Sequence, residues 1–154
     1  MKKKFIYLFA LVFTLNMGYS QSNQSVYAEL LGNGLIFSFN YDTRFTAKPT
    51  GIGGRAGLGY IGKGDNGAVL IPFQLNWLLG KNGKYFELGL GATYVGGTEE
   101  FFEEDIDHFV GTMTFGYRRQ PEDGGFMWKA AITPVLADGF FWPYYVGFSL
   151  GYAF

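Results

Sequence analysis

The residue best suited to acid–base chemistry in this sequence is its single histidine, His108. An imidazole titrates near neutral pH and can activate a serine beside it when a carboxylate orients the ring. Several acidic residues precede His108 closely, but the position that would share its face on a strand is Val110. Because no serine lies there, we expect His108 to be a solvated residue and the chain to have no enzymatic activity.

Two other segments have residue types that could bind ligands. Residues 57–62 match the Gly-x-Gly-x-x-Gly pattern of dinucleotide sites, but they lack the following helix and the acidic residue about 20 positions later. Residues 99–107 hold six of the thirteen acids, and carboxylates bind divalent cations, although the spacing matches no calcium loop. We expect no cofactor and a solvated acidic loop over residues 97–107, with cation binding or protein binding as the alternatives.

The composition excludes several other kinds of chemistry. The 154 residues include no cysteine, so disulfides, cysteine-ligated zinc and a thiol nucleophile are all excluded. Hydrophobic residues make up 48% of the chain and charged residues 16%, which argues against a disordered protein. Among the remaining residues we expect no metal site, and the length fits one domain.

The first twenty residues have the features of a secretory signal peptide. Three lysines precede an apolar run over residues 5–15, and Gly18 and Ser20 supply the small residues of a cleavage site. The run is too short to cross a bilayer as a helix. We therefore expect a cleaved peptide over residues 1–20 and a mature domain over residues 21–154. Cleavage would change the formal net charge from −1 to −4, so nucleic acid is not an expected partner.

The mature chain alternates with a period of two residues. In residues 85–95 the even positions are Phe, Leu, Leu, Ala and Tyr, whereas the odd positions are mostly small or polar. Turn sequences such as Asn33-Gly34 and Asn82-Gly83 separate such segments and favour tight hairpins. The pattern predicts an all-β, eight-stranded antiparallel up-and-down barrel. Its predicted strands are residues 25–31, 35–45, 52–62, 69–79, 85–95, 109–119, 126–136 and 144–154. Pro72 and Pro134 fall inside strands, so we expect a bulge or a missing backbone bond at each.

The character of the two faces distinguishes a membrane barrel from a soluble ligand-binding barrel, the less favoured alternative. One face carries large apolar and aromatic residues on essentially every strand, as a surface in contact with lipid requires. An eight-stranded barrel has room inside only for side chains, so charges on the opposite face must pair with one another. The predicted interior charge network is Glu29, Asp42, Arg44, Arg55, Glu87, Arg118 and Lys129.

The last predicted strand carries a further signal. Phe148, Leu150, Tyr152 and the terminal Phe154 alternate with small residues. This pattern resembles the carboxy-terminal targeting strand of bacterial outer-membrane β-barrel proteins, which the barrel-insertion machinery reads. The resemblance implies a bacterial outer-membrane location, a porin-like transmembrane fold and contact with outer-membrane lipid. It implies little about activity.

The expected role follows from the short connections between strands. We expect a structural or accessory component of the outer membrane that docks to a larger complex, and the aromatic connection over residues 139–143 is either a docking patch or part of an aromatic belt. The alternative is a lipid-modifying or small-solute transporting barrel, in which the interior charges would be functional.

Overall fold

The computed structural model describes residues 22–63, 66–97, 109–137 and 139–154 of the chain. The predicted signal peptide, the acidic segment over residues 99–107 and His108 lie outside these residues. Within the described ranges, no helix is long and apolar enough to cross a membrane.

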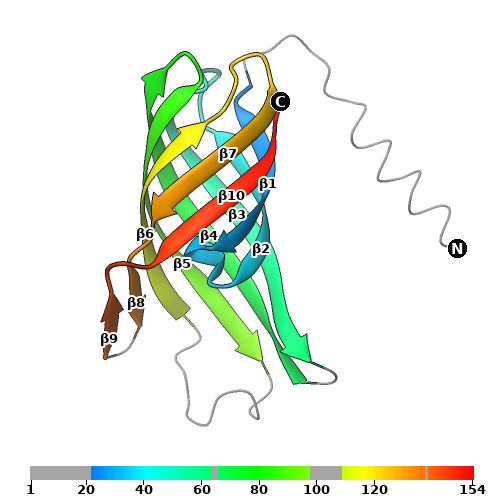
Figure 1. Ribbon diagram of the computed structural model, residues 1–154, viewed down its shortest axis with the longest axis vertical. Helices are drawn as coiled ribbons and strands as arrows, with labels where there is room; N and C mark the ends of the chain where they lie inside the picture. Colours follow the sequence, from blue (N-terminus) through cyan, green and yellow to red (C-terminus); the bar gives the residue numbers. More distant parts are fainter. Residues whose placement is uncertain (1–21, 64–65, 98–108, 138) are drawn as a thin grey trace, which may run out of the picture.

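The chain forms a closed antiparallel barrel of eight strands, which confirms the predicted fold (Figure 1). Each strand pairs with the next along the chain until β7, which pairs with β10, and β10 closes the barrel on β1. A small hairpin of β8 and β9 extends from β6. The strands are β1 (Gln24–Leu31), β2 (Phe37–Arg44), β3 (Gly51–Lys63), β4 (Asn66–Lys81), β5 (Lys84–Gly97), β6 (Phe109–Arg119), β7 (Gly125–Ile132), β8 (Val135–Ala137), β9 (Phe140–Trp142) and β10 (Val146–Ala153).

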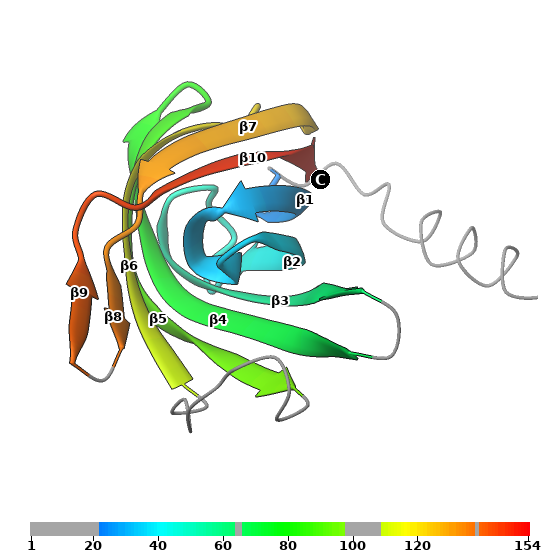
Figure 2. The ribbon, with the colours of Figure 1, turned by 60° about the horizontal axis from the view of Figure 1, so that its bottom comes forward.

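The two ends of the barrel differ. Residues 22 and 154 lie at the same end as the turns after β2, β4 and β6, because Ser22 N–H donates to the Glu122 carbonyl and Gln24 N–H to the Phe154 carbonyl. We call this the terminal end, and the opposite end, which carries β8 and β9, the hairpin end. β3, β4 and β5 have 13, 16 and 14 residues, whereas β1, β2, β7 and β10 have eight each. One wall therefore extends further toward the hairpin end (Figures 1 and 2).

Side chains alternate between the outside and the inside as the period of two predicts. On β4, Leu75 is 61% exposed and Trp77 49%, whereas Gln74 and Asn76 are each 3% exposed. β10 shows the same division, since Phe148, Leu150 and Tyr152 face outward while Ser149 is buried. The outer surface is therefore apolar and aromatic, and most of the interior is polar.

The two prolines disturb the sheet in different ways. At Pro72 the pairing of β3 with β4 lapses between Ala56–Phe73 and Gly59–Leu70, while the register stays the same on both sides. At Pro134 the predicted strand over residues 126–136 divides into β7 and β8, so predicting one continuous strand there was wrong. Val135 faces Trp142 but Ile132 faces Val146, which leaves residues 133–134 opposite residues 143–145. This unequal count is a β-bulge. Beyond it β8 stays paired with β6 in the register of β7, and β9 pairs with β8 only.

The predicted Asn82-Gly83 turn behaves as expected, and the predicted Asn33-Gly34 turn does not. Asn82 and Gly83 have φ angles of 57° and 71°, as a tight turn between β4 and β5 requires. Residues Gly32–Gly34 instead form a 3-10 turn, η1, that is buried inside the barrel. β2 consequently begins at Phe37 and not at residue 35, and the prediction of a tight Asn33-Gly34 hairpin was wrong. Local turn chemistry could not reveal that this turn has partners across the barrel.

Close packing of backbone against backbone can be tested at Gly91. A Cβ added there would collide with the Phe73 carbonyl of the neighbouring strand. We expect Gly91→Ala to lower the free energy of unfolding by about 1–3 kcal/mol. Gly111→Ala is the matched control, because its nearest atom would be 3.5 Å away. Equilibrium unfolding followed by tryptophan fluorescence measures both, and equal stability of the two variants would contradict this account.

Candidate functional site

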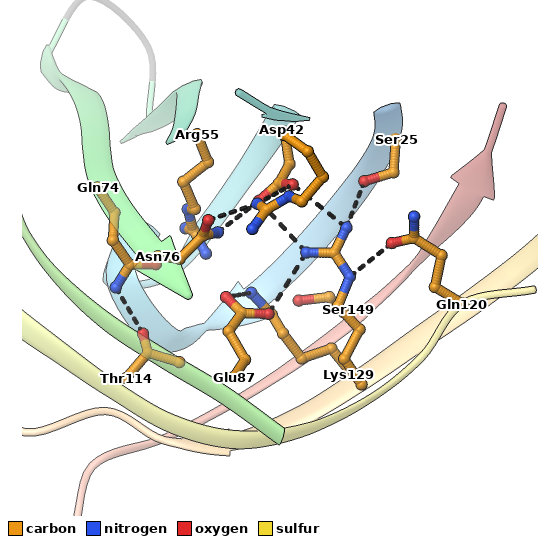
Figure 3. Close-up of polar contacts among 12 residues, drawn as sticks. Ser25, Asp42, Arg55, Gln74, Asn76, Glu87, Thr114, Gln120, Lys129 and Ser149 are labelled. Atoms are coloured by element: carbon orange, nitrogen blue, oxygen red, sulfur yellow. Dashed lines mark hydrogen bonds and ion pairs between the residues drawn. The ribbon is translucent and has the colours of Figure 1, made fainter. Parts of the chain in front are cut away.

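The candidate site is the charged interior of the barrel. Its seven charged residues come from six strands, and each is at most 4% exposed. Period-two alternation places every one of them on the inward face. The structure therefore brings all seven predicted interior residues into one enclosed region. Figure 3 shows part of it, with Asp42, Arg55, Glu87 and Lys129 labelled.

Glu29 is the centre of one half of this network. Arg55 binds its carboxylate through both terminal nitrogens, with 3.0 Å between Nη1 and Oε1. Lys129 Nζ lies 3.7 Å from Oε1, and the hydroxyl of Ser149 donates to the same oxygen at 3.4 Å. The backbone N–H of Gly34 donates to Oε2 at 3.2 Å. Both carboxylate oxygens thus have partners from the protein.

Glu87 and Asp42 connect the other bases. Lys129 Nζ lies 3.2 Å from Glu87 Oε1, and Arg118 Nη1 lies 3.4 Å from Glu87 Oε2. The same Arg118 nitrogen lies 3.3 Å from Asp42 Oδ2, and Arg44 Nη2 donates to Asp42 Oδ1 at 2.6 Å. Because Lys129 also contacts Glu29, the seven residues form one continuous chain of ion pairs.

Uncharged side chains complete the network. Asn76 donates to Asp42 Oδ2 at 2.5 Å and accepts a hydrogen bond from Arg44. Arg118 donates to the Ser25 hydroxyl at 2.7 Å and to the Gln120 amide oxygen at 2.8 Å. These bonds hold the bases in fixed positions.

The ring of Tyr27 lies among three of the bases. Its centroid is 4.9 Å from Lys129 Nζ, 5.6 Å from the Arg55 guanidinium carbon and 5.9 Å from that of Arg118. The face of an aromatic ring attracts cations, and this attraction strengthens where water is excluded. The ring therefore offsets part of the imbalance between four bases and three acids.

The buried turn η1 closes the interior next to the charged network, and sequence reasoning missed it. Asn33 Oδ1 accepts a hydrogen bond from the Thr114 hydroxyl at 2.9 Å, and its backbone carbonyl accepts one from Thr93. Gln74 in turn donates to the Thr114 hydroxyl at 2.7 Å. The glycines on either side of Asn33 were the only sign that the chain could turn inward here.

The interior changes character toward the hairpin end. Five apolar side chains from four strands form a buried cluster there: Ala68, Leu70, Val95, Val110 and Val135. Leu35, Ile61 and Tyr145 pack against it. The expectation of a small or polar inward face does not hold for this part. On β4 the change falls at Pro72, because the inward residues Ala68 and Leu70 precede it and the inward residues Gln74 and Asn76 follow it.

The network has the chemistry of a structural site. Each of its three acids pairs with two of the four bases, and all seven side chains are buried. Among the residues that the structure describes, no cluster of three His, Asp or Glu side chains could hold a metal ion. The glycines of residues 57–62 lie within β3, and Gly57 and Gly59 approach the backbone of β2 closely.

The fold and its two faces define the class of the molecule: a closed eight-stranded antiparallel β-barrel with an apolar exterior and a charged, filled interior. No family model, no curated protein and no solved structure matches this chain. The class therefore rests on the fold and on the distribution of its side chains.

The contribution of the network can be measured at Glu29. We expect Glu29→Gln to lower the free energy of unfolding by about 3–5 kcal/mol, because it leaves the buried Arg55 without its partner. Asp123→Asn, which changes an exposed carboxylate, is the control and is expected to cost less than about 1 kcal/mol.

A second substitution separates lost pairing from general damage. In the Glu29→Gln background, Arg55→Met should cost less than it does in the native chain, because the unpaired charge has then gone. Strictly additive effects in this double-mutant cycle would show that the two residues do not stabilise each other.

Proposed function

We propose that this chain is an integral β-barrel of the bacterial outer membrane that acts as a structural or accessory component without enzymatic activity. The single observation that supports it most strongly is the inversion of the two faces. Charged side chains are buried inside the barrel, whereas large apolar side chains such as Leu75, Leu90 and Phe126 are 61–66% exposed. Water would penalise that exposed surface, and lipid would accept it.

Closure of the barrel supports the same proposal. Hydrocarbon offers no partner to backbone N–H and C=O groups, so a sheet in lipid needs every strand edge paired. The β1–β10 and β5–β6 pairings close the sheet. A cleaved signal peptide over residues 1–20 and recognition of Phe148, Leu150, Tyr152 and Phe154 by the insertion machinery would deliver the chain to this membrane.

The filled interior favours a structural role over transport. The ion-pair network, the turn η1 and the apolar cluster occupy the barrel from the terminal end to the hairpin end. A solute would have to break buried ion pairs to pass. Among the residues that the structure describes, the acids and bases also lie in no arrangement that favours lipid modification, so we do not advance the transporting or lipid-modifying alternative.

The β8–β9 hairpin is the proposed docking element for a larger outer-membrane complex. β8 continues the wall beside β6, and β9 presents Phe140, Phe141 and Trp142, which are 49–59% exposed. With the termini in the periplasm, this hairpin would lie on the outer side of the membrane. Aromatic side chains of this kind dominate the energetics of protein interfaces.

The experiment that tests the proposal is purification from native membranes. We expect the processed chain to resist carbonate extraction, to need detergent, and to co-purify with a stoichiometric partner in mild detergent. Phe141→Ser combined with Trp142→Ser should remove the partner but leave the barrel in the membrane, whereas Tyr60→Ser, at another exposed aromatic, should do neither. A native chain that is monodisperse in plain buffer would refute the membrane location, and a lone monomer would refute the docking role.

Lipid contact also predicts a dependence on depth. Leu90→Arg places a charge midway along β5. We expect it to lower the free energy of unfolding in a bilayer by about 2–4 kcal/mol, because the charge would lie in hydrocarbon. Phe126→Arg is matched in exposure but lies near a strand end, where the same charge should cost about 0–1 kcal/mol. Titration with urea in lipid vesicles measures both, and equal costs would argue against a membrane around this face.

A further inference from the structure

Three basic residues lie side by side on the outer surface at the terminal end. Lys81 at the end of β4 faces Lys84 on β5, and Lys84 faces Arg119 on β6. All three are on the outward face, where the two lysines are exposed and Arg119 is half-buried. Directly opposite side chains have Cβ atoms about 5 Å apart, so this basic row concentrates positive charge.

No acid neutralises the basic row among the residues that the structure describes. None of the three bases lies within ion-pair distance of a described carboxylate; the ion pairs found are those of the interior. Glu122, in the turn after β6, accepts hydrogen bonds from the Asn82 N–H at 2.9 Å and the Tyr85 hydroxyl at 3.4 Å. Like charges directly opposite one another destabilise a sheet, so an external anion would relieve the repulsion.

Aromatic side chains place the basic row at a polar–apolar boundary. Trp128 on β7 faces Arg119 and continues the same row. Its ring lies 5.4 Å from that of Tyr117, which belongs to the next outward row toward the hairpin end. Tryptophan and tyrosine gather where lipid headgroups meet hydrocarbon. The basic row therefore lies where a headgroup phosphate would be.

An apolar groove begins directly beyond the basic row. The next outward row runs through Phe86, Tyr117, Ala130, Phe148 and Leu30, which face one another in turn across β5, β6, β7, β10 and β1. Because Ala130 is small and Tyr117 and Phe148 are large, the surface is hollowed between them. This groove has a volume of about 710 Å³ and is lined almost wholly by apolar side chains and by glycine. It could hold hydrocarbon chains.

We propose that the basic row and this groove together form a binding site for an anionic phospholipid of the periplasmic leaflet. The phosphate would lie between Lys84 and Arg119 with Lys81 beside it, and an acyl chain would follow the groove past Tyr117 over Ala130. Positive charge next to an apolar groove selects such a molecule over a zwitterionic lipid or a free anion. The inference rests on the proposed membrane location, which puts the terminal end in the periplasm.

The intrinsic fluorescence of Trp128 gives a direct test. In a full-length chain carrying Trp77→Phe and Trp142→Phe, Trp128 is the remaining tryptophan. We expect phosphatidylglycerol with brominated acyl chains to quench it more efficiently than brominated phosphatidylcholine in mixed vesicles. Each base near an anionic surface contributes about a fivefold preference, so Lys84→Gln with Arg119→Gln should reduce the preference about 25-fold.

Matched controls separate this site from general surface charge. Lys48→Gln removes an exposed base at the same end but outside the basic row, and it should leave the preference unchanged. Gel mobility before and after heating verifies that each variant is folded. The phospholipid site would be overturned, with the barrel still in the membrane, by any of three results. The two brominated lipids could quench Trp128 equally, or Lys48→Gln could reduce the preference as much as the double variant does. Lipid A could also compete with phosphatidylglycerol for the site more strongly than phosphatidylglycerol itself binds. Absence of quenching by either lipid would instead refute the membrane location.

Discussion

An eight-stranded barrel leaves inside it only the space that side chains can fill, and this geometric limit governs the rest of the structure. Charges that point inward are removed from water, so each needs a partner of opposite sign at short range. Glu87 meets this need by contacting both Lys129 and Arg118, and Glu29 does so by binding Arg55. The apolar exterior is the other consequence of the same alternation, because a strand that turns its polar residues inward must turn the others outward.

The interior is organised in layers along the barrel axis. Ion pairs fill the part toward the terminal end, the buried turn η1 and its amide and hydroxyl partners come next, and aliphatic side chains fill the part toward the hairpin end. Gly34 joins the first two layers, because its N–H donates to Glu29. The charged network and the turn therefore stabilise each other, and the interior is a continuous packed core. Such a core gives a small barrel rigidity and leaves its outer surface and rims as the places where partners can bind.

Much of this arrangement could be predicted from the sequence because the side-chain period of a strand determines which residues share a face. The barrel, the number of its strands, the inward position of the seven charged residues and the disturbances at both prolines follow from that period and from the chemistry of proline. The pairing within the network could not be predicted, because Arg118 and Asp42 meet across the interior and not along neighbouring strands. The inward fold of η1 was missed for the same reason. Asn33 finds Thr93 and Thr114 only once the barrel has closed, and a local turn signal carries no information about such partners.

Charge on the inside of the wall also affects what the outside can bind. Arg118 points inward and its neighbour Arg119 outward, so the interior network and the basic row lie on opposite sides of one layer of strands. Within the described residues the interior holds four bases and three acids, and the excess positive charge lies in a medium that screens it less than water does. Its field adds to that of Lys84 and Arg119 on the surface. The exposed carboxylate of Asp123 is at the tip of the β6–β7 turn, where water and salt screen it more strongly. The wall beside β5 and β6 therefore attracts anions from the interface, even though the chain as a whole carries a net negative charge.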